Sequence, residues 1–247
     1  MKTFPRLKFC GFTREIDVEN AIEAGASAIG LNFVAASKRY VDVHTAARLS
    51  HVAAGRVERV GVFANASPDQ VQEVLQTCPL DTIQLHGDED LTWLQGVRQR
   101  EGLNRLAVLR AVRYRGPEDH PTIAAWSREA NDPESPVSAI LVDAYSPGHL
   151  GGTGLTVRWD LLYPRPQSFF ACKASGSSET QSSSAPMILA GGLDRNNVFQ
   201  ALRIAHPDGI DLASGIESQP GVKDRDAMVT IAAIVRQYFE ERSSGKK

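Results

Sequence analysis

Two residues at the ends of predicted strands could carry out proton transfer. Cys10 closes an apolar run that begins at Leu7, and Asp143 closes a second apolar run about 130 residues later. A thiolate can take a proton from carbon, and a carboxyl group can give one to oxygen. The pair predicts acid–base chemistry on a small molecule, provided that the fold brings the two strand ends together.

The elements that must position this pair follow a regular alternation. Short apolar runs of β type are separated by longer helical patterns, which is typical of parallel strands buried on both faces. Eight such units fit a single-domain (β/α)8 TIM barrel over residues 1–247, and an open doubly wound sheet is the alternative. The predicted strands are 7–12, 27–33, 57–63, 82–85, 105–112, 139–143, 187–190 and 209–213. The predicted helices include 15–24, 45–53, 69–76, 90–100, 196–204 and 226–241, with Asn196 as an N-cap.

Polar residues after several strands extend the candidate site. In a parallel barrel the reactive groups come from the C-terminal strand ends and the loops that follow them. Arg39 lies in the loop after the second strand, and Gln84 and His86 end the fourth. We expect these side chains to bind the substrate; the alternatives are a solvated loop charge for Arg39 and packing at the rim for His86.

Two glycine-containing turns indicate a phosphate site. Gly191-Gly192 and Ser214-Gly215 follow the seventh and eighth predicted strands. Exposed amides at such turns and at helix N-termini bind anions, and phosphate is the usual ligand after strands seven and eight of a barrel. A tight turn can also need glycine for steric reasons alone. Because both turns occur in adjacent units, we expect them to bind phosphate.

A third glycine-rich loop follows Asp143. Its glycines at 151, 152 and 154 predict a hinged flap over the site, with Gly152 and Gly154 touching the substrate, whereas a flexible connector is the alternative. Closure of a flap would take water away from the carboxyl group and favour its neutral form.

Composition excludes several classes of function. With 27 Lys and Arg against 29 Asp and Glu, the formal charge of −2 gives no support for binding nucleic acid or a membrane surface. No run approaches the roughly 18 apolar residues of a membrane span, and no signal peptide is apparent. The three widely spaced cysteines fit neither a zinc site nor a disulfide framework, so we expect no metal and a cytoplasmic location.

One segment interrupts the rhythm of the barrel. Residues 164–186 are rich in serine and cannot bury much apolar surface, which predicts a flexible insertion before the seventh strand. A regulatory or partner-binding role is the alternative to an idle loop.

Seven motifs in order along the chain resemble the phosphoribosylanthranilate isomerase family. They cover residues 7 to about 241 and comprise Lys8-Phe9-Cys10-Gly11-Phe12-Thr13-Arg14, Val60-Gly61-Val62-Phe63-Ala64-Asn65, Ile83-Gln84-Leu85-His86-Gly87-Asp88-Glu89, Asp143 with Gly151-Gly152-Thr153-Gly154, Leu189-Ala190-Gly191-Gly192-Leu193, 210–217 and Gly221-Val222-Lys223-Asp224.

The resemblance implies a TIM barrel that works without a cofactor. Its reaction would be an Amadori rearrangement of N-(5-phosphoribosyl)anthranilate to 1-(2-carboxyphenylamino)-1-deoxyribulose 5-phosphate in tryptophan biosynthesis. By the family pattern, Cys10 is the general base, Asp143 is the general acid, and Arg39 faces the anthranilate carboxylate. The loops after strands seven and eight would hold the phosphate. The resemblance also allows association with other tryptophan-pathway enzymes.

Neighbouring residues refine these expectations. Lys8 lies two residues before Cys10 on the same strand face, so we expect its charge to lower the pKa of the thiol. Two positions depart from the family pattern: Lys38 replaces a proline, which predicts a less rigid second loop, and Arg158 stands where an acid is usual.

Two rival readings remain open from the sequence. One is another phosphosugar barrel, either an isomerase of histidine synthesis or indole-glycerol-phosphate synthase, although these lack the pair Cys10 and Asp143. The other is a non-catalytic barrel that binds a partner, against which the intact acid and base argue.

Overall fold

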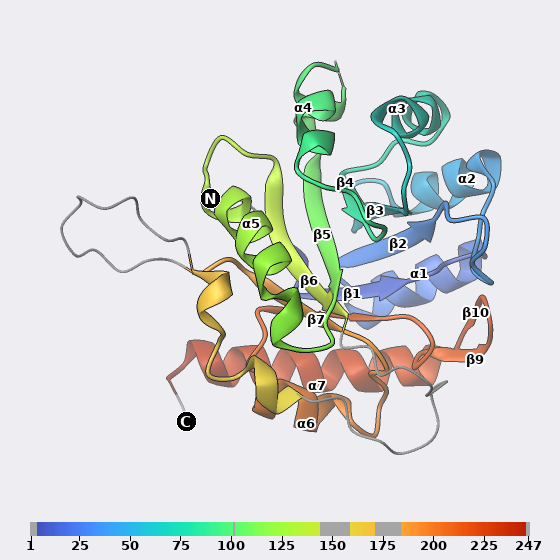
Figure 1. The fold of residues 1–247 in the computed structure, drawn as a ribbon. Helices are drawn as coiled ribbons and strands as arrows, with labels where there is room; N and C mark the ends of the chain where they lie inside the picture. Colours follow the sequence, from blue (N-terminus) through green and yellow to red (C-terminus); the bar gives the residue numbers. More distant parts are fainter. Residues whose placement is uncertain (1–3, 101, 144–158, 171–183, 246–247) are drawn as a thin grey trace, which may run out of the picture.

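The computed structural model describes residues 4–100, 102–143, 159–170 and 184–245. Eight parallel strands form a closed barrel in sequence order, and β8 closes the ring by pairing with β1 (Figure 1). The closed barrel confirms the predicted (β/α)8 fold and excludes the open sheet. The strands are β1 (Leu7–Cys10), β2 (Ala28–Asn32), β3 (Glu58–Phe63), β4 (Thr82–Leu85), β5 (Ala107–Arg113), β6 (Val137–Asp143), β7 (Met187–Ala190) and β8 (Gly209–Leu212).

Successive side chains of each strand point to opposite faces of the sheet and therefore pack into two different hydrophobic cores. One parity points into the barrel and forms a small cluster of short and branched side chains, which consists of Ala28, Val60, Leu109, Ala111, Ala139, Leu141, Ile188 and Ala190. The other parity packs against the helices in a much larger cluster. Cys10 and Lys8 are two residues apart on β1 and both point into the barrel. Asp143 points inward as well, because it follows Ala139 and Leu141 at intervals of two residues on β6.

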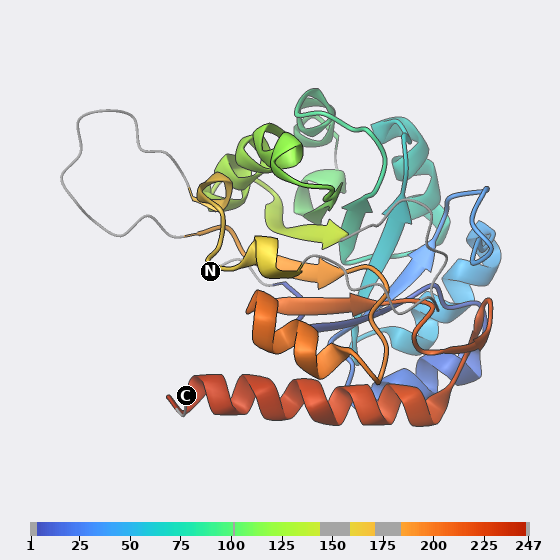
Figure 2. The same ribbon diagram turned by 60° about the horizontal axis from the view of Figure 1, so that its bottom comes forward.

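Helices cover the outside of the barrel, as Figure 2 shows. They are α1 (Glu15–Ala24), α2 (Val43–Ala53), α3 (Pro68–Thr77), α4 (Thr92–Arg98), α5 (His120–Asn131), α6 (Val198–Ala205) and α7 (Arg225–Ser243). The short 3-10 helices are η1 (Leu103–Arg105), η2 (Pro117–Asp119), η3 (Trp159–Leu162) and η4 (Gln167–Phe169). A hairpin of β9 (Glu217–Gln219) and β10 (Val222–Lys223) follows β8, at the end to which the strand arrows point.

Local chemistry explains where several helices begin and end. Ser67 and Gln70 form a capping box at the start of α3, with Pro68 in the first turn. Gly25 ends α1 in the left-handed conformation, with φ of 94°. The predicted N-cap Asn196 is wrong: Asp194 accepts the amide hydrogens of Asn196 and Asn197, and α6 starts only at Val198.

The two flanks of the serine-rich segment are described and pair with each other. Phe170 and Ser184 form an isolated bridge, and Phe169 is fully buried in the outer core. Residues 171–183 lie outside the described residues, so the flexible insertion stays a prediction. Within the described ranges, no helix combines the length and the apolar character needed to cross a membrane.

Candidate active site

Cys10 ends β1 at the inner wall of the barrel. Its side chain is buried, and the facing residue on β2 is Gly30, where a Cβ atom would lie only 2.5 Å from Sγ. The carbonyl oxygen of Cys10 accepts a hydrogen bond of 2.6 Å from Nζ of Lys223. The thiol therefore has a fixed backbone and a restricted space.

A buried ion pair lies directly below the thiol. Lys8 and Asp211 face each other across β1 and β8, with Nζ and Oδ2 separated by 2.9 Å. Burial disfavours the ammonium, but the carboxylate of Asp211 and the thiol of Cys10 together raise the pKa of Lys8. The second oxygen of Asp211, Oδ1, is buried and has no hydrogen-bond partner among the described residues.

The expected depression of the thiol pKa is wrong in its net direction. Burial raises the pKa of Cys10 above its ordinary value, and the ammonium groups of Lys8 and Lys223 oppose this rise without cancelling it. The carboxylate of Asp211 adds to the rise. Lys8 does act on the thiol as expected, but desolvation is the larger effect.

Asp143 ends β6 near Gln84 of β4 and His86, which directly follows that strand. Its Oδ2 lies 3.4 Å from Nε2 of His86, and Nδ1 of the same ring lies 2.9 Å from Nε2 of Gln84. Gln84 is buried, whereas His86 and Asp143 keep about a quarter of their side-chain surface exposed. Gln84, His86 and Asp143 thus form one line of contacts, from the barrel interior to its mouth.

Arg39 reaches the same mouth from the loop after β2. Its guanidinium forms two hydrogen bonds with Glu217, Nε to Oε1 and Nη2 to Oε2, each 2.7 Å long. Nζ of Lys223 also donates to Oε1 of Glu217 over 2.8 Å. Glu217 therefore joins the arginine of one loop to the lysine that holds the backbone of Cys10.

The loop that carries Arg39 has internal hydrogen bonds despite its missing proline. Asn32 accepts from the amide of Val34 and donates to the hydroxyl of Ser37. The same hydroxyl accepts from the backbone amide of Arg39 over 3.1 Å. These three bonds provide part of the rigidity that a proline at position 38 would supply.

The two candidate phosphate turns lie side by side. Asp194 and Gly215 form a β-bridge, and a Cβ atom at Gly215 would overlap the carbonyl oxygen of Leu193. Gly191 and Gly192 both have positive φ, at 91° and 61°, which favours glycine. Ser214 precedes Gly215 at the end of β8 and accepts from the amide of Glu217. The fold thus brings the predicted turns together at the carboxyl ends of β7 and β8.

Part of the predicted site lies outside the described residues. Gly152 and Gly154 belong to the segment 144–158, as does Arg158, so the flap stays a prediction. Within the described part of the chain, no cluster of three or more metal-ligating side chains occurs.

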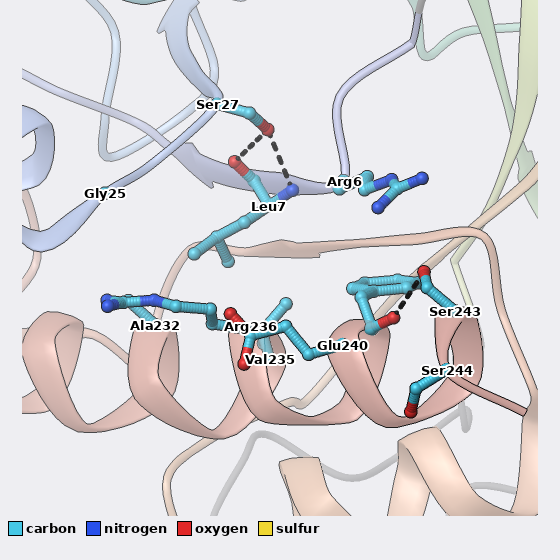
Figure 3. Close-up of a pocket in the computed structure, with 11 residues that line it drawn as sticks. Arg6, Leu7, Gly25, Ser27, Ala232, Val235, Arg236, Glu240, Ser243 and Ser244 are labelled. Atoms are coloured by element: carbon cyan, nitrogen blue, oxygen red, sulfur yellow. Dashed lines mark hydrogen bonds between the residues drawn. The ribbon is translucent and has the colours of Figure 1, made fainter. Parts of the chain in front are cut away.

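A separate pocket opens at the opposite end of the barrel. Its volume is about 610 Å³. Figure 3 shows Leu7, the first residue of β1, above α7, which contributes Arg236 and Glu240 to the lining. Ser27 bonds both the amide and the carbonyl of Leu7 there. This pocket lies at the amino end of β1, whereas Cys10 and Asp143 lie at the carboxyl ends of β1 and β6.

Sequence reasoning missed three charged residues at the site: Asp211, Glu217 and Lys223. All three belong to the family motifs quoted above, but no role was assigned to them. Their proximity to the strand-end cysteine depends on contacts across more than 170 residues, which local spacing does not express.

Comparisons with known proteins identify the relatives of the chain. The family model described as N-(5'phosphoribosyl)anthranilate (PRA) isomerase matches residues 7–234. An N-(5'-phosphoribosyl)anthranilate isomerase of Myxococcus xanthus is 36% identical over 223 residues, which cover 90% of this chain and 92% of that protein. A relative of the same name from Bordetella avium is 39% identical over 226 residues, with 90% and 91% covered.

A solved structure leads to the same family. The phosphoribosyl anthranilate isomerase of Thermotoga maritima superposes with a TM-score of 0.76 at 29% identity, covering 95% of this chain and all of that one. A structure of such an isomerase with reduced 1-(o-carboxyphenylamino)-1-deoxyribulose 5-phosphate has a TM-score of 0.73 at 27% identity, with 95% and 100% covered. The chain belongs to the N-(5'-phosphoribosyl)anthranilate isomerase family.

Proposed function

We propose that this chain isomerises N-(5-phosphoribosyl)anthranilate to 1-(2-carboxyphenylamino)-1-deoxyribulose 5-phosphate, a step of tryptophan biosynthesis. The observation that carries the proposal is the match of residues 7–234 to the family. In addition, the thiol of Cys10 and the carboxyl group of Asp143 belong to the last residues of β1 and β6, at inward-facing positions. The rival phosphosugar enzymes share the phosphate turns, but their chemistry does not use this pair.

Asp143 is the proposed general acid. Protonation of the furanose oxygen opens the sugar ring and leaves an iminium ion between the ribose and the aromatic amine. His86 lies 3.4 Å from the carboxyl group and is held on its other side by Gln84. His86 and Gln84 therefore support the orientation of Asp143 and line the substrate space.

Cys10 is the proposed general base. The iminium ion acidifies the proton on carbon 2 of the sugar, so a thiolate is a sufficient base for its removal. The resulting enolamine becomes the ketone of the product when carbon 1 gains a proton and the hydroxyl group on carbon 2 loses one. The carbonyl contact with Lys223 and the close approach of Gly30 support a fixed position for the sulfur.

The charged groups of the substrate have separate proposed partners. Arg39 would bind the anthranilate carboxylate, because a guanidinium can donate two parallel hydrogen bonds to it. The amides of Gly191, Gly192, Ser214 and Gly215 would bind the phosphate at the ends of β7 and β8. Gly152 and Gly154 would contact the substrate from the flap.

The cellular location of the enzyme and its association with other proteins are also proposals. The described cysteines, Cys10 and Cys78, are both free thiols, which fits a cytoplasmic location. Association with other tryptophan-pathway enzymes stays a prediction.

A turnover assay tests the proposed function. N-(5-phosphoribosyl)anthranilate is formed freshly from anthranilate and ribose 5-phosphate, and loss of its fluorescence is followed after enzyme is added. We expect catalysed loss and a ketose product identifiable by mass and NMR. Purified, folded protein that does not accelerate this conversion would refute the proposed function.

A further inference from the structure

The two side chains of the ion pair between Arg39 and Glu217 differ in how deeply they are buried. The side chain of Glu217 is only 4% exposed, whereas that of Arg39 is 23% exposed. The acid is thus the enclosed partner, and the guanidinium is the one that a ligand can reach. Glu217 is placed to act on Arg39 rather than on a ligand.

Glu217 is held by two further donors besides the arginine. Its Oε1 accepts from Nζ of Lys223 over 2.8 Å and from the amide of Gly221 over 3.3 Å. Burial opposes the charge, yet the hydrogen bonds from Arg39 and Lys223 bring the pKa of Glu217 below its ordinary value. The acid is therefore an anion at neutral pH and a permanent acceptor for the guanidinium.

The pattern of hydrogen bonds leaves one edge of the guanidinium unused. An arginine has five N–H donors in a rigid plane, and Glu217 takes one from Nε and one from Nη2. Among the residues that the structure describes, Nη1 has no acceptor. Nη1 and the second hydrogen of Nη2 form the end-on edge, which can accommodate another carboxylate in the same plane.

The aliphatic part of Arg39 is confined as well. A Cβ atom at Gly11 would overlap Cδ of Arg39, and Gly11 has a φ of +83° directly after Cys10. The arginine therefore passes over the backbone next to the candidate base. Lys223 joins the same arrangement, since its Nζ binds both Glu217 and the carbonyl oxygen of Cys10.

We propose that Glu217 is the positioning residue that presents the end-on edge of Arg39 to the substrate carboxylate and so sets the preference for a carboxylated aromatic amine. The inference rests on the proposed function, in which Arg39 binds that carboxylate. The position of this edge matters because a small displacement of a bound substrate costs a large factor in rate.

Two substrates that differ only in the carboxylate test the inference. The second substrate is the phosphoribosyl adduct of aniline, prepared like that of anthranilate, and product formation is followed by chromatography. In the Glu217→Gln enzyme we expect the preference in kcat/KM for the carboxylated substrate to fall about ten- to hundredfold, while turnover of the aniline adduct changes little. Equal loss on both substrates would mean a merely structural role and would overturn the inference.

A double-mutant comparison shows whether Glu217 acts through Arg39. If it does, the double variant Arg39→Met/Glu217→Gln has the same substrate preference as the single variant Arg39→Met. A further fall in that preference would contradict the inference. The matched control is Asp81→Asn, which removes a similar two-bond pair with Arg59 at the start of β3 and β4 and should leave the preference unchanged.

A crystal structure of the wild-type enzyme with the reduced product gives an answer that needs no variant. The inference expects Glu217 to stay on Nε and Nη2, with the ligand carboxylate on Nη1 and Nη2. A ligand carboxylate that displaces Glu217 would overturn it, even if every variant failed to fold. Absence of wild-type turnover of the anthranilate adduct would instead refute the proposed function, so the two failures are distinguishable.

Discussion

Sγ of Cys10 and the α-carbon of Gly30 are in such close contact that no side chain fits between them: a Cβ atom at Gly30 would lie 2.5 Å from the sulfur. The two residues are register partners in β1 and β2. The absence of a side chain on β2 therefore creates the space that the thiol occupies at the inner wall of the barrel.

Replacement of Gly30 should displace the thiol. In Gly30→Ala we expect a fall in kcat of about 10–10²-fold, because misplacement of a base by a fraction of an ångström weakens proton transfer. Steady-state kinetics and the rate of Cys10 alkylation measure the effect.

Gly61 on the neighbouring strand provides the matched control. It points outward, and a Cβ atom there would overlap Leu80 instead of a site residue. Gly61→Ala should lower the melting temperature and leave kcat near the wild-type value. Equal kcat losses in both variants would contradict the specific role of Gly30.

The reactivity of the Cys10 thiol should keep rising with pH beyond the ordinary range of a thiol. Burial raises the pKa of Cys10 above the ordinary value of a thiol, so the thiolate fraction still increases as the pH passes that ordinary value. Asp211→Asn removes a charge that raises this pKa and should move the rise to lower pH. Lys8→Met removes a charge that lowers it and should move the rise to higher pH.

Alkylation by iodoacetamide as a function of pH measures the thiol directly, with a Cys10→Ala enzyme as the blank for the other cysteines. Burial raises the pKa of Cys78 to about 11, which keeps its contribution small near neutrality. A wild-type profile that levels off below the ordinary pKa of a thiol would contradict the raised pKa of Cys10.

A buried ion pair behind the site should matter for stability. Glu89 is 3% exposed and accepts from the amides of Asn65 and Gly87 and from Nη1 of Arg110 over 3.0 Å. Glu89→Gln leaves the buried guanidinium without its counter-charge, so we expect a loss of about 3–5 kcal/mol in the free energy of unfolding. Urea denaturation gives this value.

Glu19→Gln is the control for that measurement. Glu19 pairs with Arg56 over 2.7 Å, but both side chains are largely solvated. Its removal should hardly change the unfolding midpoint. A midpoint for Glu89→Gln that matches the control would refute the stabilising role of the buried pair.

The sequence was informative where chemistry and periodicity are local. The eight strands appear as apolar runs, and the prediction that Cys10 and Asp143 end the first and sixth strands is confirmed. The helix α5 was not among the predicted segments, because its buried face consists of Ile123, Trp126 and two small residues. The hairpin β9–β10 was missed as well, since its strands have only three and two residues.

The site was less predictable because its electrostatics depend on long-range contacts. Arg39 and Glu217 are 178 residues apart, and Lys8 and Asp211 are 203 apart. The sign of the thiol pKa shift was predicted wrongly for the same reason: the ammonium of Lys8 is visible in the sequence, whereas the degree of burial is a property of the closed barrel.

The most direct test of the central claim compares wild type with Cys10→Ser and Asp143→Asn. Turnover of N-(5-phosphoribosyl)anthranilate and the Kd of the reduced product are measured for all three enzymes. The account predicts that each substitution lowers kcat by about 10²–10⁴-fold while the Kd stays within a few-fold of wild type. Near-normal kcat in either variant would contradict the assignment of that residue to proton transfer.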